Sequence, residues 1–370
     1  MDSAHRTTLT RFLIEERRQH PHAVGDFNSL LLNVALVCKR IARLAAHGAL
    51  VGASEQAGAV NVQGEVQQPL DVLANDIFLR AHEVGGQVAG MVSEELEAPY
   101  PIARHQRGRY LLVFDPLDGS SNVDVNLSVG SIFSVLRAPD DACDGELERN
   151  LHGNPEDELP VEAFLQPGVQ QVAAGYAIYG PSTMLVLTVG TGTHGFTLCP
   201  NLGEFMLTHP HMQIAPDTQE FAINASNSRF WERPIKRYVD ECLAGRSGER
   251  EKDFNMRWIA SLVAEAHRIL MRGGVFMYPR DQRDPARPGR LRLLYEANPI
   301  AFIVEQAGGR ASTGLMPVLQ VPPTSIHQRV PLIFGSANEV ARLERYHAEP
   351  ADSHHATPLF AERSLFRAQA

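Results

Sequence analysis

An apolar segment in the first half of the chain ends in acidic residues that could bind a metal ion. Residues Leu111–Asn122 read LLVFDPLDGSSN. Asp115 and Asp118 lie three positions apart around a proline, so their carboxylates can turn toward one point, and the Leu117 carbonyl can add a third oxygen ligand. Oxygen ligands of this kind suit Mg²⁺ or Mn²⁺. The segment therefore predicts a divalent metal site at a strand end, where the active sites of open α/β sheets lie.

The residues that follow are suited to binding phosphate. Gly119 lets the backbone approach an anion closely, and Ser120 and Ser121 can donate hydrogen bonds from their hydroxyl and N–H groups. A metal site beside such a turn indicates phosphoryl chemistry. The same residue types also favour an ordinary turn after a strand, so composition alone leaves both interpretations open.

Further acidic residues could belong to the same site. Glu94 and Glu95 directly follow Ser93 at the end of a predicted strand, Val88–Val92, and Asp71 stands at the start of a predicted helix. Each of these acids alone is more often a surface charge. They form part of a metal site only if the fold brings them to the two aspartates, which one sequence does not establish.

Length and composition limit the classes of protein to consider. The chain has 370 residues, 44% of them hydrophobic and 21% charged, which indicates a large layered protein or two packed domains and excludes a mainly disordered chain. A formal net charge of -9 argues against nucleic-acid binding, and the apolar stretches are too short to cross a membrane. We expect a cytoplasmic protein. The cysteines form no CxxC pair, which favours free thiols: Cys38, Cys143, Cys199 and Cys242.

The first half of the chain predicts two helices and a sheet. Apolar residues recur at intervals of three and four over Phe27–His47 and again over Leu70–Ala81, with a loop at Leu50–Pro69 between them. Short β-type runs follow in the first half: Val88–Val92, Tyr110–Phe114, Ser131–Leu136, Val172–Tyr179, Met184–Val189 and Gly195–Leu198. The acidic stretch 139–160 predicts a solvated insertion.

The second half predicts alternating strands and helices. The predicted strands are Phe221–Asn224, Val275–Tyr278, Leu291–Leu294 and Leu332–Phe334, and the predicted helices are Arg233–Leu243, Arg257–Met271 and Asn298–Gln306. This change of pattern suggests an N-terminal domain over residues 1–212 and a C-terminal domain over 213–348. Residues 349–370 are expected to form a loosely ordered tail.

Three motifs together resemble class 1 fructose-1,6-bisphosphatase. They are DPLDGSSN at Asp115–Asn122, the acidic Ser93–Glu95, and GRLRLLYEANPIA at Gly289–Ala301, and the resemblance extends from about Asp26 to about Val340. The first motif is shared with the wider Mg²⁺-dependent, lithium-sensitive sugar-phosphatase superfamily and would leave inositol monophosphatase open. The Leu293–Glu296 block separates the two, because inositol phosphatases carry a Trp-Asp element there.

The resemblance implies a five-layer α-β-α-β-α fold of the α/β class and a role for each matching residue. The implied metal ligands are Glu94, Asp115, the Leu117 carbonyl, Asp118 and Glu296. Asp71 and Glu95, with Glu94 beside them, would position and deprotonate the attacking water, and Glu65 would enter with the preceding loop. The implied substrate-binding residues are Asp118, Gly119, Ser120, Ser121, Asn224, Arg257, Tyr278 and Arg290.

The implied activity is Mg²⁺-dependent hydrolysis of the 1-phosphate of fructose 1,6-bisphosphate, in gluconeogenesis or the Calvin cycle. Water would attack directly, so the serines would bind phosphate and form no phosphoenzyme. Arg257 would reach into a neighbouring subunit of a homotetramer. Two alternatives are a sedoheptulose 1,7-bisphosphatase and a catalytically silent sugar-phosphate sensor, although a sensor would gain nothing from clustered like charges.

Several positions depart from the family pattern. Arg290 stands where many members have lysine, and Asn227 and Trp258 stand where many have tyrosine. The threonines of the family's AMP site are replaced by Val24 and Asn28. The valine has no hydroxyl group to donate to phosphate, although Arg109 and Tyr110 are retained at the other wall. We therefore expect weak or absent inhibition by AMP. A disulfide switch is not expected, because the acidic insertion contains only Cys143.

Overall fold

The computed structural model describes residues 7–19, 25–47, 68–139, 159–280, 283 and 288–349. Within these residues no helix combines the length and the apolar character needed to span a membrane. Several positions discussed above lie outside the described residues: Val24, Glu65, Cys143, most of the 50–69 loop, most of the acidic insertion and nearly all of the tail.

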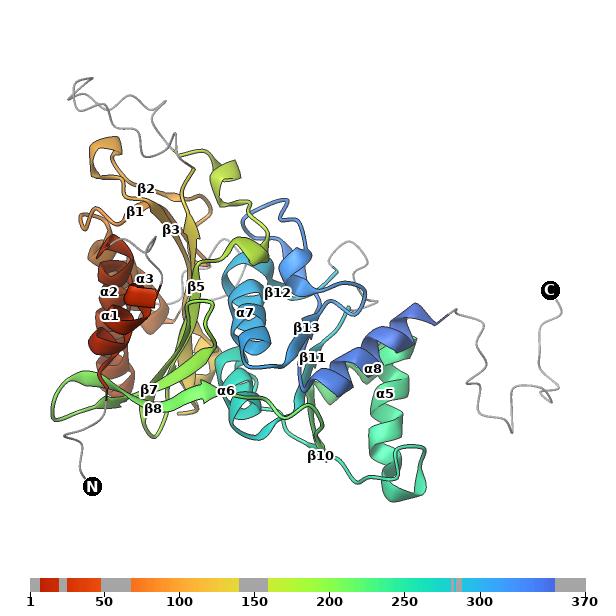
Figure 1. Ribbon diagram of the computed structural model, residues 1–370. Coiled ribbons are helices and arrows are strands. Elements are labelled where there is room, and N and C mark those ends of the chain that lie inside the picture. The colour runs from red at the N-terminus through yellow and green to blue at the C-terminus, as the bar shows by residue number, and fades with distance from the viewer. Residues whose placement is uncertain are drawn as a thin grey trace.

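Three helices cover one face of a large sheet (Figure 1). The helices are α1 (Leu9–Gln19), α2 (Gly25–His47) and α3 (Pro69–His82). The sheet has the order β2-β1-β3-β4-β5-β6-β7-β8. Its strands are β1 (Val88–Ser93), β2 (Tyr100–Pro101), β3 (Tyr110–Asp118), β4 (Val129–Arg137), β5 (Ala173–Tyr179), β6 (Thr183–Thr188), β7 (Thr193–Cys199) and β8 (Glu204–Met212).

A second sheet lies beyond a central pair of helices. Helices α6 (Leu262–Arg272) and α7 (Asn298–Gln306) lie between the two sheets, and α5 (Arg233–Ala244) and α8 (Ala337–Ala348) cover the outer face of the second one. The second sheet has the order β10-β9-β11-β15-β13. Its strands are β9 (Glu220–Ile223), β10 (Asn255–Met256), β11 (Val275–Tyr278), β13 (Arg310–Ser312) and β15 (Leu332–Gly335), and β12 (Leu291–Arg292) pairs separately with β14 (Arg329–Val330).

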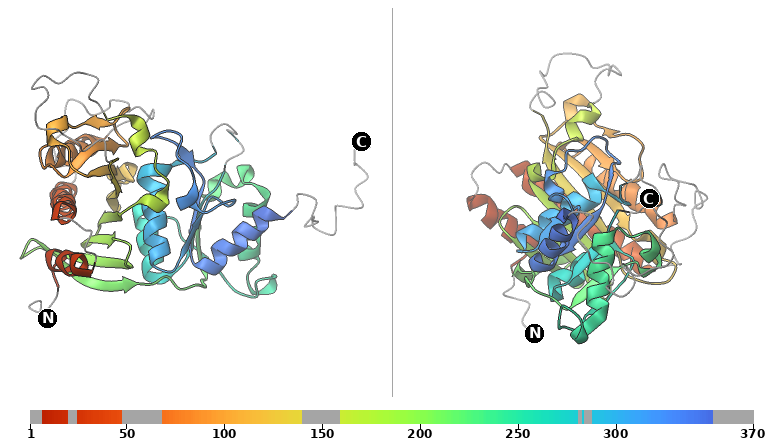
Figure 2. Two further views of the ribbon diagram at one scale, coloured as in Figure 1. Left: turned by 45° about the horizontal axis from the view of Figure 1, so that its top comes forward. Right: turned by 90° about the vertical axis from the view of Figure 1, so that its right-hand side faces the viewer.

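The succession helix, sheet, helix, sheet, helix confirms the predicted five-layer fold, and the left view of Figure 2 shows it from another side. Separate apolar clusters fill the spaces between layers. One lies between α1–α3 and the first sheet, one surrounds α6 and α7, and one lies between the second sheet and α5 and α8. Strand β3 is buried along its whole length because helices cover both faces of its sheet.

Two predicted elements differ from the structure, and both differences bear on the site. The predicted helix 257–271 begins only at Leu262, because Ser261 caps it by accepting a hydrogen bond from the N–H of Ala264 at 3.3 Å. The predicted strand Leu291–Leu294 stops at Arg292, and a π-helical turn, Leu293–Ala297, follows. Such turns are rare and occur often at functional sites.

Two helices, α1 and α8, were not predicted, and neither were the strands β2, β8, β10, β13 and β14. Helices α1 and α8 are short and rich in charged residues, so their apolar faces are narrow. Strand β8 contains Pro210, which argues against a central strand but is tolerated here because β8 lies at the edge of its sheet.

The first sheet ends at Met212 and the second begins at Glu220, and the proposed domain boundaries stay a prediction.

Candidate active site

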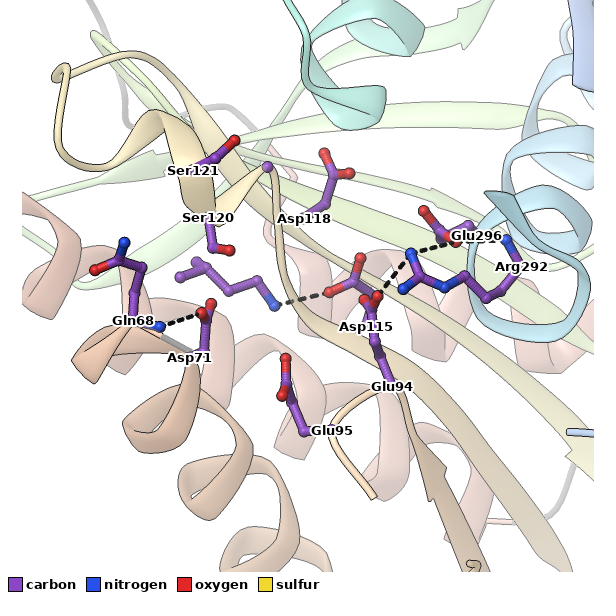
Figure 3. A pocket seen from close by; sticks show the side chains of 12 residues that line it. Gln68, Asp71, Glu94, Glu95, Asp115, Asp118, Ser120, Ser121, Arg292 and Glu296 are labelled. Atoms are coloured by element: carbon purple, nitrogen blue, oxygen red, sulfur yellow. Dashed lines mark hydrogen bonds and ion pairs between the residues drawn. The ribbon is translucent and has the colours of Figure 1, made fainter. Parts of the chain in front are cut away.

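A cavity of about 460 Å³ opens at the end of strand β3. Residues from β3, from α3, from the turn after β1 and from the π-helical turn surround it, and Figure 3 shows their carboxylates converging on one space. The cavity is lined by Gln68, Asp71, Glu94, Glu95, Asp115, Leu117, Asp118, Gly119, Ser120, Ser121, Arg292 and Glu296. Within the described part of the chain, the structure therefore brings together all the residues that were expected to bind metal or act in catalysis.

The end of β3 supplies two of the acids. The pairing of β3 with β4 shifts register between Asp115 and Asp118, so the strand is irregular where the two carboxylates emerge. The Leu117 N–H donates to Asp115 Oδ1 at 3.0 Å. Asp115, Asp118 and Glu296 are all buried, and each places an oxygen within 4.8 Å of the others. This set of clustered carboxylate oxygens fits a hard divalent cation.

Strand β1 and helix α3 bring further acids to the same cavity. Strand β1 runs parallel to β3, and the Glu94 N–H donates to the Phe114 carbonyl at 3.2 Å, which places Glu94 beside the start of the Asp115 segment. Asp71 lies at the third position of α3, where its Oδ2 accepts from the Gln68 N–H at 2.8 Å in a capping box. Helix capping thus orients Asp71 at the cavity wall.

Burial makes the ionised form of these acids unfavourable. It raises the pKa of Asp71 to about 7 and that of Glu296 to about 8, and it holds the pKa of Asp115 well above its ordinary value. Charge repulsion adds to the effect, since Glu94 opposes ionisation of Asp115 and of Glu296. A bound divalent cation would reverse this penalty by giving the carboxylates a positive partner.

Asp118 also caps the helix α6. Its carboxylate accepts from the Ser261 hydroxyl at 2.9 Å and from the N–H groups of Leu262 at 3.3 Å and Val263 at 2.8 Å. Burial raises the pKa of Asp118, while these hydrogen bonds act in the opposite direction. Asp118 is therefore shared between the acidic cavity and the start of a helix in the central layer.

Arg292 and Gln68 line the cavity, although sequence reasoning assigned them no role. The Arg292 guanidinium lies 2.9 Å from Glu94 and 3.8 Å from Glu296 and is itself buried. It supplies a positive charge among the acids. Arg292 belongs to the Gly289–Ala301 motif, four residues before Glu296, so its place in the sequence was a usable signal.

The turn after Asp118 has the geometry expected of an anion-binding segment. Gly119 has φ 74°, and a side chain there would bring a Cβ within 2.9 Å of the Ser261 Cβ. Glycine is thus required both by the backbone conformation and by the close approach. Ser120 and Ser121 follow at the cavity wall.

The four residues expected to bind the rest of the substrate do not line this cavity. Asn224, Arg257 and Tyr278 lie at the carboxyl ends of β9, β10 and β11, which are parallel neighbours, so they share one edge of the second sheet. Arg257 is exposed, with an ion pair to Glu220 at 3.7 Å. Arg290 is exposed just before β12.

Hydrogen bonds join that sheet edge to the acidic cavity. The Asn122 side chain donates to the carbonyls of Ile259, at 3.4 Å, and Ala260, at 3.2 Å. Ala260 has φ 61°, an unusual conformation for a residue with a side chain. The segment between Arg257 and α6 is therefore fixed against the turn that carries Gly119 to Ser121.

Family profiles match almost all of the described chain. The profile "Fructose-1-6-bisphosphatase, N-terminal domain" matches residues 7–210, and the profile of the C-terminal domain matches residues 214–348. The chain belongs to the fructose-1,6-bisphosphatase family. Fructose-1,6-bisphosphatase class 1 of Hydrogenophilus thermoluteolus is 62% identical over 369 residues, 99% of each chain, and that of Methylacidiphilum infernorum is 55% identical over the same share.

Solved structures of fructose-1,6-bisphosphatase agree with this assignment. The holo form of the Leishmania major enzyme has a TM-score of 0.82 at 38% identity, covering 93% of this chain and 99% of that one. The T-state of the same enzyme has a TM-score of 0.78 over the same shares. The predicted family is confirmed, and membership in it removes inositol monophosphatase as an alternative.

Proposed function

We infer that this chain hydrolyses fructose 1,6-bisphosphate to fructose 6-phosphate and inorganic phosphate. The assignment depends on one combination: full-length similarity to class 1 fructose-1,6-bisphosphatases, and a cavity in which clustered carboxylates face a glycine-serine turn. Phosphate-monoester hydrolysis needs positive charge near the phosphoryl oxygens, an oriented water and donors that hold the phosphate. The cavity has residues for each of these tasks.

The metal is proposed to be Mg²⁺, with Mn²⁺ as a substitute. Asp115, Asp118, Glu296, Glu94 and the Leu117 carbonyl would hold it, and this all-oxygen set of buried, mutually repelling acids suits such an ion. When bound, a divalent ion would withdraw charge from the phosphoryl group and lower the pKa of water.

The protein's own groups are proposed to divide the remaining work. Asp71, whose pKa burial raises to about 7, is suited to take a proton from the attacking water near neutral pH, with Glu95 nearby to orient that water. Gly119, Ser120 and Ser121 would donate to the 1-phosphate. No nucleophilic serine is required: the water oxygen would bond to phosphorus as the bond from phosphorus to the sugar O1 breaks, and O1 would take up a proton as fructose 6-phosphate leaves.

The sugar and the 6-phosphate are proposed to extend toward the edge of the second sheet. Asn224, Tyr278 and Arg290 would contact them there, and Arg257 would act across a subunit boundary in a homotetramer. The exposure of Arg257 and the hydrogen bonds from Asn122 to its neighbours support this arrangement. A cytoplasmic location and a place in gluconeogenesis or the Calvin cycle stay predictions.

A phosphate-release assay tests the function. Purified protein with Mg²⁺ and fructose 1,6-bisphosphate should release one phosphate and form fructose 6-phosphate, and chelation of the metal should stop the reaction. Binding of the sugar without phosphate release would favour the sensor. A higher kcat/KM for sedoheptulose 1,7-bisphosphate than for fructose 1,6-bisphosphate would favour the alternative substrate.

A further inference from the structure

One histidine outside the acidic cavity connects the two segments that carry metal-binding acids. His327 Nδ1 lies 2.8 Å from the Tyr295 hydroxyl, and His327 Nε2 lies 2.9 Å from the Leu96 carbonyl. Tyr295 directly precedes Glu296, and Leu96 directly follows Glu95. A single imidazole therefore spans the turn after β1 and the π-helical turn after β12.

The chemistry of the partners fixes the roles of the two ring nitrogens. A carbonyl only accepts, so Nε2 must carry the proton that it donates to Leu96, and neutral Nδ1 then accepts from the Tyr295 hydroxyl. Burial lowers the pKa of His327 and raises that of Tyr295, which favours the neutral form of both. The Tyr295 side chain is fully buried, and its ring meets the imidazole at 69° with centroids 5.9 Å apart.

Other contacts also hold the two segments, among them the ion pair of Arg292 with Glu94, but His327 is a neutral side chain that hydrogen-bonds to both of them. The turn at Ser93 is closed by the Leu96 N–H donating to the Ser93 carbonyl at 3.3 Å, a long hydrogen bond. The π-helical turn is tied to the histidine's own segment, because the Leu293 N–H donates to the Gln328 carbonyl at 2.7 Å. Movement of His327 would therefore alter the spacing of Glu94 and Glu296.

We propose that His327 is a positioning residue, which holds the Glu94 turn and the Glu296 turn at the separation that divalent metal binding requires. The proposal rests on the metal site inferred above, and it gives His327 no contact with substrate or metal. Groups that orient metal ligands typically change metal affinity by about 10- to 100-fold when removed.

The test is Mn²⁺ binding measured by calorimetry on substrate-free protein, with the Mg²⁺ dependence of activity as a second readout. His327→Ala should weaken Mn²⁺ binding by about 10-fold and raise the half-saturating Mg²⁺ concentration, with a smaller change in KM for the sugar. His327→Gln can retain the donor to Leu96, and His327→Asn can retain the acceptor for Tyr295. Each should recover part of the lost affinity.

Two further variants separate positioning from general stability. Tyr295→Phe removes only the hydroxyl and should also weaken Mn²⁺ binding. The double variant with His327→Ala should bind Mn²⁺ almost as well as His327→Ala alone, because both changes remove the same hydrogen bond. The pair Tyr176 and His267 is a matched control, because the Tyr176 hydroxyl lies 3.0 Å from His267 Nδ1 but neither residue is adjacent in the sequence to a proposed metal ligand. His267→Ala should leave Mn²⁺ affinity unchanged.

The outcomes are distinct. Unchanged Mn²⁺ affinity in the Ala, Gln and Asn variants and in Tyr295→Phe overturns the role of His327, and so does an equal loss in His267→Ala. If His327→Ala does not fold, the Mn²⁺ affinities of His327→Gln, His327→Asn and Tyr295→Phe test the proposal instead. Failure of the unaltered protein to bind Mn²⁺ overturns the metal site itself, a different result from normal binding that His327 does not affect.

Discussion

Replacing Glu296 with glutamine should stabilise the metal-free protein while removing its response to metal. The Glu296 carboxylate is buried in the cavity wall, accepts from the Arg292 N–H at 2.6 Å and lies within 4.8 Å of Asp115 and Asp118. Glutamine has nearly the same shape and can still accept that hydrogen bond through its amide oxygen. It removes one of the mutually repelling charges and one proposed metal ligand.

The size of the effect follows from the raised pKa. Burial raises the pKa of Glu296 from 4.5 to about 8. The folded protein therefore holds a proton that the unfolded chain releases between these values, and stability falls as pH rises from 4.5 to 8. At about 1.4 kcal/mol per pKa unit, the penalty above pH 8 is at most about 5 kcal/mol. For a chain of this length, that corresponds to roughly 6 °C in the melting temperature.

Thermal unfolding of both proteins at pH 5 and pH 8.5, with and without Mg²⁺, provides the assay. Without metal, Glu296→Gln should melt close to the unaltered protein at pH 5 and several degrees above it at pH 8.5. With Mg²⁺, only the unaltered protein should gain stability. If the two proteins differ by the same melting temperature at pH 5 and at pH 8.5, the burial argument is refuted. Equal stabilisation of both proteins by Mg²⁺ would refute the assignment of Glu296 as a metal ligand.

Three further predictions concern turnover, substrate binding and regulation. Asp118→Asn should lower kcat about 100-fold or more at saturating Mg²⁺, because an anionic ligand is lost; an unchanged kcat would contradict the metal assignment. Arg257→Ala should raise KM for fructose 1,6-bisphosphate about 10-fold with little change in kcat, as expected for a phosphate contact made equally in the ground and transition states; a loss in kcat alone would contradict it. AMP should inhibit weakly, since the Asn28 amide already donates to the Leu13 carbonyl at 3.2 Å; strong cooperative inhibition at micromolar AMP would exclude this interpretation.

The acidic half of the site was predictable because its signals are local. A buried strand followed by DPLDGSSN predicts where Asp115, Asp118 and the serines lie. The acidic pair after another strand, Glu94 and Glu95, predicts further carboxylates for the same site. Whether these segments converge depends on the parallel pairing of β1 and β3, which the sequence does not encode at short range. The motif resemblance, not periodicity, connected Glu296 to them.

The parts that could not be predicted are tertiary in origin. Asp118 accepts hydrogen bonds from residues 143 to 145 positions later, and helix α6 begins at Leu262, five residues after the apolar pattern suggested. The strand predicted over Leu291–Leu294 had a suitable composition, but its last two residues enter the π-helical turn instead. Hydrophobic spacing alone contains no signal for these contacts.

The energetic cost of burying carboxylates in the cavity helps to distinguish an enzyme from a sugar-phosphate sensor. Asp71, Asp115 and Glu296 are buried with raised pKa values, so each opposes folding near neutral pH in the absence of a cation. Residues that violate the rules for a stable core are expected mainly at functional sites. A protein that only bound a sugar phosphate would be more stable without these buried acids. It would also bind its ligand more tightly, because phosphate and carboxylate repel each other. Their combination with a phosphate-binding turn is therefore explained by metal-assisted phosphoryl hydrolysis and not by sugar-phosphate binding alone.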